Sequence, residues 1–158
     1  MSVNIRVDAK LDTGAKTSAI HAEILSRKSL DENQIAELRE ETDDDEEVLD
    51  EEEAELSDEE TADRPRRVVF RISNEDGEER ILEREIVRYV SIKKRGGGLE
   101  ERPVIELELC IAGIKVKGDV SLADRTQFNY PLLIGREMLE AGHIAVNPDV
   151  DYTASPRC

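Results

Sequence analysis

The chain has 158 residues, with 22 Lys and Arg against 38 Asp and Glu and a net charge of −16. Half of these acidic residues, 19, fall between Asp31 and Pro65 beside only two basic ones, so the remainder of the chain is close to neutral. A segment of this composition buries too little apolar area to offset its ordering entropy, and its like charges repel. We therefore expect a single domain over residues 1–158, with a disordered acidic insertion at about 31–65.

Composition also excludes several classes of protein. The longest apolar runs, such as Leu132–Ile134, are far too short to span a bilayer, and the N-terminus has no basic start followed by an apolar stretch. A protein that binds nucleic acid would be expected to carry a basic stripe and more than five aromatic residues. Two cysteines, Cys110 and Cys158, do not make a disulfide framework, and Cys158 is expected to fray. These features favour a soluble, cytoplasmic protein.

Before the insertion, two segments have β-character. Apolar residues alternate with polar ones over residues 3–11, which is the period of a half-buried strand. This strand runs into Asp12-Thr13-Gly14-Ala15, where the glycine permits a tight turn. Residues 17–25 form a second candidate strand.

After the insertion, short apolar segments alternate with turn signals. Asn74-Glu75-Asp76-Gly77 predicts a hairpin turn. A short helix is expected over residues 135–140, ended by Gly142. The expected strands are 67–72, 81–92 (whose Glu and Arg content would also suit a helix), 104–111, 115–122, 131–134 and 144–146. This pattern predicts a mostly β fold, a closed sheet or barrel with one short C-terminal helix.

Two motifs resemble those of the retropepsin family of aspartic proteases. The first is Asp12-Thr13-Gly14-Ala15 at a strand end, and the second is Ile134-Gly135-Arg136 at the end of an apolar strand. The resemblance implies the closed acid-protease barrel. It also implies that Asp12, Thr13 and Gly14 form the catalytic loop, that Ala15 contacts substrate, and that Ile134, Gly135 and Arg136 pack behind the loop as structural support.

A closer similarity extends over most of the chain outside the insertion. Residues 12–22, 101–105 and 120–136 are similar to a bacterial and archaeal group of small retropepsin-like proteins that carries the name "ATP-dependent zinc protease". That group is linked by genome neighbourhood to RimK-type glutamate ligases. The similarity therefore implies a peptide substrate, with a glutamate-rich protein tail as the candidate.

The chemistry of such a site requires two carboxylates. One deprotonates water and the other donates to the carbonyl oxygen, and the two share one proton because both cannot easily ionise together. This chain has a single Asp-Thr-Gly, so a working pair needs Asp12 from each of two chains facing each other across a two-fold axis. The sequence therefore predicts a homodimer, with Thr13 hydrogen-bonding across the axis.

A glycine triplet lies between two strand-like runs. By resemblance Gly96, Gly97 and Gly98 correspond to the flexible flap that closes over peptides in retropepsins, although a merely mobile hairpin tip has the same sequence. The basic residues beside it, at 93–95, would favour an acidic peptide if they overhang the site.

One departure from the family pattern and two rival functions remain. Lys16 stands where retroviral members have an acidic partner for the arginine of the Gly-Arg motif, so Arg136 needs another partner, such as Asp124, or has none. A non-catalytic peptide-binding module would keep the fold without turnover. The group's name suggests a zinc-dependent protease as the other rival. The sequence has no His-Glu-x-x-His motif, and the candidate zinc ligands are His21 and Cys110 together with a carboxylate. We expect no metal and no cofactor.

Overall fold

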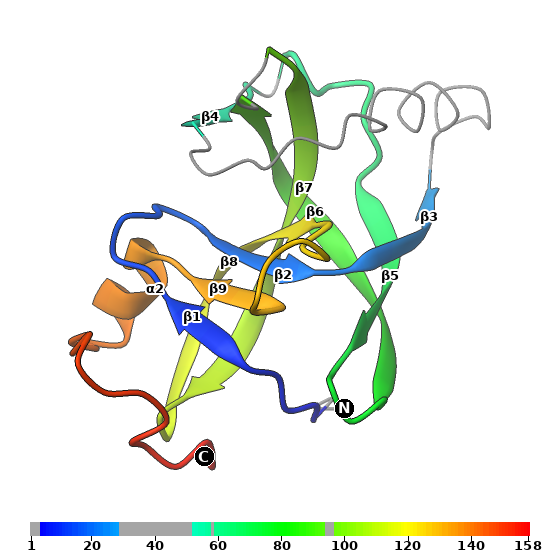
Figure 1. The fold of residues 1–158 in the computed structure, drawn as a ribbon. Helices are drawn as coiled ribbons and strands as arrows, with labels where there is room; N and C mark the ends of the chain where they lie inside the picture. Colours follow the sequence, from blue (N-terminus) through cyan, green and yellow to red (C-terminus); the bar gives the residue numbers. More distant parts are fainter. Residues whose placement is uncertain (1–3, 29–51, 58, 94–96) are drawn as a thin grey trace.

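A computed structural model describes residues 4–28, 52–57, 59–93 and 97–158 (Figure 1). The elements, in chain order, are β1 (Ala9–Leu11), β2 (Ser18–His21), β3 (Glu23–Lys28), β4 (Glu52–Glu55), β5 (Arg67–Ser73), β6 (Glu79–Lys93), β7 (Leu99–Ile111), β8 (Ile114–Ala123), β9 (Leu132–Ile134) and α2 (Arg136–Ala141). Over these residues, the expected mostly β fold with one short helix is confirmed. None of the helices in the described segments has the length and apolar character needed to cross a membrane.

The strands form one curled sheet, with β1 at one edge and β3 at the other. Its hydrogen-bonded order is β1-β9-β2-β8-β7-β6-β5-β3, with β4 added to β6. The expectation of a closed barrel is corrected, because β1 and β3 end this path and do not pair with each other. The sheet still curls. β2 pairs with β8 and β3 pairs with β5, which lie far apart along this path, yet Ala22 alone separates β2 from β3 in the chain.

Strand boundaries follow hydrophobic alternation where one face is buried. In β5, Val68, Phe70 and Ile72 are buried while their neighbours are not, which is the period of a strand covered on one side. The turn after β5 has Gly77 at a φ of +81°, and it joins β5 to β6 as the sequence predicts. The candidate second strand over residues 17–25 is instead two strands, and residues 144–146 form no strand although Ile144 and Val146 pack against the core.

The C-terminal part of the expected disordered segment is ordered. β4 pairs antiparallel with β6, from Glu52 opposite Lys93 to Glu55 opposite Val90. Beyond it Thr61 is buried, and Arg64 forms two hydrogen bonds of 3.0 Å with the Glu101 carboxylate. Backbone pairing and this charged contact outweigh the repulsion among the acidic side chains. Residues 31–51 and residue 58 of the insertion lie outside the described residues.

The helix α2 closes one side of the core. Glycines bound it at both ends, Gly135 as the N-cap residue and Gly142 at the C-cap. Its buried residues Met138 and Leu139 belong to the main hydrophobic cluster, and Met138 contacts β8 at Gly118. This packing fixes the first turn of α2 against the segment that follows Asp12.

Candidate active site

Asp12 is placed by the pairing of two short strands. β1 lies parallel to β9 with Leu11 opposite Ile134, and the backbone N–H of Asp12 donates to the Ile134 carbonyl at 2.9 Å. Ile134 is fully buried, so this hydrogen bond fixes the start of the Asp12 loop to the core. The arrangement leaves the Asp12 side chain 29% exposed, accessible to solvent at the surface of a single chain.

The loop closes on its own carboxylate. The backbone N–H of Gly14 donates to Asp12 Oδ1 at 2.9 Å, the geometry of an Asx turn. A Cβ at Gly14 would lie only 3.3 Å from the same oxygen, which explains why the position suits glycine. Asp12 Oδ2 lies 3.8 Å from Lys10 Nζ. The carboxylate is therefore oriented by its own loop and has a cation nearby.

The Ile134-Gly135-Arg136 segment lies directly behind the loop. The backbone N–H of Arg136 donates to the Ala15 carbonyl at 2.7 Å. Gly135 approaches the backbone after Ala15 so closely that a Cβ on Gly135 would lie 2.7 Å from the carbonyl carbon of Thr17. The two sequence motifs, more than a hundred residues apart, are thus joined backbone to backbone.

The side chain of Arg136 does not support the loop. Its nearest acidic partner is Glu140 on the next turn of α2, with Arg136 Nε 3.9 Å from Glu140 Oε1. The expected partner Asp124 instead accepts hydrogen bonds from the Thr126 backbone and hydroxyl. The reason is the direction of α2, which begins at Arg136 and keeps its side chain on the helix surface. Lys16 pairs at 3.7 Å with Glu137, the neighbour of Arg136.

Ser18 is a supporting residue that the sequence did not single out. Its side chain is buried, its Oγ accepts the backbone N–H of Gly135 at 3.0 Å, and its carbonyl accepts the Ser121 hydroxyl at 3.3 Å. Ser18 therefore connects the Asp12 segment, the β9–α2 junction and β8. The only sequence signal was its place inside the motif that begins at Asp12.

The glycine triplet is described in part. Gly96 lies outside the described residues, while Gly97, with a φ of +104°, and Gly98 lead into β7. β6 and β7 pair from Lys93 opposite Leu99 inward, so Gly97 and Gly98 lie in the connection between these two strands. A contact of this connection with the Asp12 loop stays a prediction.

The residues considered for zinc are engaged elsewhere. Cys110 forms a disulfide with Cys158, and His21 Nδ1 accepts the backbone N–H of Arg125 at 2.8 Å. Within the described ranges, no group of three or more His, Cys, Asp or Glu side chains could hold a metal ion. His21 and Cys110 are thus not brought together as ligands.

Comparison with known proteins places the chain in a family. A family model described as "RimB-like: Retropepsin-like aspartic endopeptidase RimB" matches residues 53–157, a range that begins after the Asp12 loop. A solved protein of unknown function from Legionella pneumophila has a similar fold, with a TM-score of 0.57, 25% sequence identity, and coverage of 93% of this chain and 84% of that one. No curated protein matches the sequence. The chain belongs to the RimB-like family of retropepsin-like aspartic endopeptidases.

Proposed function

We propose that this chain is an aspartic peptidase-like hydrolase that acts as a homodimer with Asp12 from each chain. The observation that carries the proposal is the Asp12 loop itself, closed by the Gly14 N–H and hydrogen-bonded to the backbone of Ile134 and Arg136, in a member of a retropepsin-like endopeptidase family. A loop of this rigidity keeps a carboxylate oriented at the surface, and catalytic groups need such preorganisation.

In the proposed reaction two Asp12 carboxyl groups share one proton. The ionised one accepts a proton from water as its oxygen attacks the peptide carbonyl carbon, and the protonated one donates to the carbonyl oxygen. The tetrahedral diol collapses when the C–N bond breaks: one carboxyl gives its proton to the leaving amine while a diol hydroxyl gives its proton to the other carboxylate, which restores the pair with one shared proton. One water is consumed, and an acid and an amine are released. Activity should follow a bell-shaped pH profile whose two limbs belong to the pair of carboxyls.

The proposed substrate is a peptide, with a glutamate-rich protein tail as the first candidate. It is supported by the similarity of residues 12–22 and 120–136 to a group linked to glutamate ligases, and by Lys93, which is exposed at the end of β6. The proposed substrate contacts are Ala15 and the glycine triplet.

The test uses quenched fluorescent peptides, with and without glutamate runs, from pH 4 to pH 8 and in the presence of EDTA. Asp12→Asn should remove at least 100-fold of the activity, while Asp76→Asn, an exposed aspartate in the β5–β6 turn, should match the wild type. Hydrolysis that survives Asp12→Asn would refute the proposal. Loss of activity in EDTA would favour a zinc-dependent protease, and peptide binding without turnover would favour a binding module.

Mixing wild type with Asp12→Asn tests the shared site. If each active site takes one carboxylate from each chain, an equal mixture should give about a quarter of the wild-type rate after subunit exchange, because only wild-type pairs are active. A rate of about half would mean that each chain works alone.

A further inference from the structure

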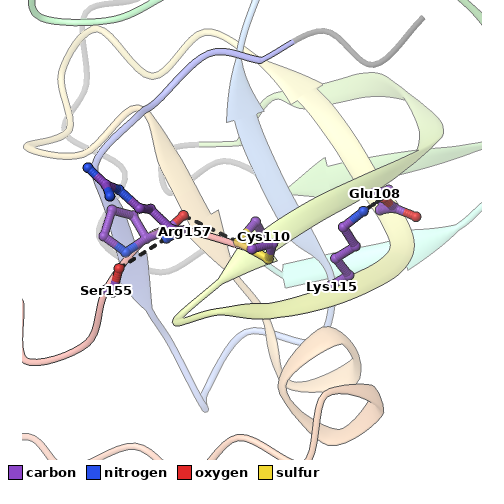
Figure 2. The surroundings of a disulfide bond; sticks show 7 residues. Glu108, Cys110, Lys115, Ser155 and Arg157 are labelled. Atoms are coloured by element: carbon purple, nitrogen blue, oxygen red, sulfur yellow. Dashed lines mark hydrogen bonds and ion pairs between the residues drawn. A yellow bond between two sulfur atoms is a disulfide. The ribbon is translucent and has the colours of Figure 1, made fainter.

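A disulfide fixes the segment that follows α2 to the end of β7. Cys110, in β7, is bonded to Cys158, 48 residues further along the chain (Figure 2). This corrects the expectation that Cys158 is a frayed, unpaired residue. The sequence could not show it, because pairing depends on where the segment after α2 runs in space.

The segment 147–158, which we term the strap, has few other attachments. All of its residues are exposed, and none belongs to a strand. Tyr152 Oη lies 3.4 Å from Asp8 Oδ2 and also hydrogen-bonds with Tyr130, and the Pro156 carbonyl lies 3.3 Å from Cys110 Sγ. A segment with so few contacts frays unless it is tied down. The disulfide adds a covalent restraint to these contacts.

The strap lies beside β1, which precedes Asp12. Asp8, the residue that Tyr152 contacts, comes directly before β1. Among the described strands β1 pairs with β9 alone, and Figure 1 shows the strap passing on the side of β1 away from β9. The other edge of β1 thus has backbone groups without a strand partner, and the contact of Tyr152 with Asp8 places the strap near the start of β1.

This edge matters for a homodimer with a shared site. Two Asp12 carboxyls can meet across a two-fold axis only if the residues next to them also approach the partner. β1 ends at Leu11, one residue before Asp12, so its open edge is the nearest backbone able to pair with a second copy. In the oxidised chain the strap contacts Asp8, the residue directly before that strand.

We propose that the strap is redox-sensitive: the Cys110–Cys158 bond holds it beside β1, and reduction releases it and frees the edge of β1 for a second copy of the chain. The dimer part rests on the proposed function. Both cysteines are exposed, so a dithiol reductant can reach them. A reductant thiolate attacks one sulfur to form a mixed disulfide. Its second thiolate then displaces that sulfur, leaving two cysteine thiols and an oxidised reductant.

The experiment compares the oxidised chain, the chain reduced with dithiothreitol, and Cys158→Ser, each by hydrogen exchange and by sedimentation velocity from micromolar to near-millimolar concentration. Reduction and Cys158→Ser should each speed amide exchange over residues 147–157 at least tenfold, and should tighten the dimer dissociation constant at least tenfold. Cys110→Ser, at the other end of the bond, should behave alike. Dithiothreitol should leave Cys158→Ser unchanged, which controls for effects of the reductant itself.

Each outcome decides. Unchanged amide exchange over residues 147–157 after reduction would refute the claim that the disulfide holds the strap in place. Faster exchange with unchanged or weaker dimerisation would overturn the role of the β1 edge. Because neither readout uses hydrolysis, a redox-dependent dimer without peptidase activity would sustain this inference while the proposed function failed.

Discussion

Gly135→Ala tests the close approach that joins the two halves of the candidate site. The residue has φ −84° and ψ 172°, a conformation open to any amino acid, so the substitution costs nothing in backbone preference. Its cost is steric, because the new Cβ would lie 2.7 Å from the Thr17 carbonyl carbon and 2.8 Å from the carbonyl oxygens of Lys16 and Thr17. Backbone atoms cannot rotate away as side chains do.

The magnitude follows from that geometry. Overpacking a tight site costs about 1–3 kcal/mol, and three backbone contacts place this case at the upper end, about 3 kcal/mol. For a chain of this length the melting temperature should fall by about 6–12 °C. The displaced segment runs directly into the Asp12 loop, so peptidase activity should fall even at temperatures where the variant is folded.

Gly118→Ala is the matched control. Its Cβ would meet the terminal methyl of Met138 at 3.1 Å, the far end of a flexible side chain that can move. We expect a loss below about 1 kcal/mol and unchanged activity. Thermal melting followed by circular dichroism, with urea titrations at 25 °C, measures both variants. If Gly135→Ala melts within a degree or so of Gly118→Ala and keeps full activity, the backbone contact behind Asp12 is wrong.

Three further substitutions test single contacts. Ser18→Ala leaves a buried backbone N–H without its acceptor and should cost about 1–3 kcal/mol in urea titrations; no change would show that the bond contributes nothing. Tyr89→Phe removes a buried hydroxyl that donates to the Pro65 carbonyl at 2.7 Å, and the free energy of unfolding should fall by about 1 kcal/mol or more. An unaltered urea midpoint would show that this hydrogen bond does not stabilise the fold. A hydrogen bond with Tyr130 raises the pKa of Tyr152 to about 12, so the fold favours the neutral phenol, and that contribution is present below pH 10 and lost as the pH rises through 12. Absorbance at 295 nm should show this late step in the wild type and lose it in Tyr152→Phe, and a step that persists there belongs to another tyrosine.

Local patterns in the sequence were sufficient for features whose cause is local. The turn before β6 was predictable because Gly77 takes a positive φ that other residues resist. The helix α2 was predictable because glycines bound a short stretch of helix-forming residues. The position of Asp12 at a strand end followed from alternation up to Leu11, although β1 is shorter than residues 3–11.

Charge counting gave a less accurate picture of the acidic segment. Its composition predicted disorder to about residue 65, yet β4 and Thr61 are ordered. Order there depends on partners that lie elsewhere in the chain, the backbone of β6 and the carboxylate of Glu101. Composition indicates the average free-energy cost of ordering a segment, but it contains no information on a specific partner surface that offsets this cost.

The sequence by itself determined the alternating strands, the glycine-bounded helix and the loop that carries Asp12, because each depends on residues within a few positions of one another. Only the tertiary structure decided that the sheet stays open between β1 and β3, that Ser18 holds Gly135, and that Cys158 returns to Cys110. The disulfide and the Ser18–Gly135 hydrogen bond join residues that are 48 and 117 positions apart. Many other chain paths are compatible with the same local pattern and would not bring these residues together.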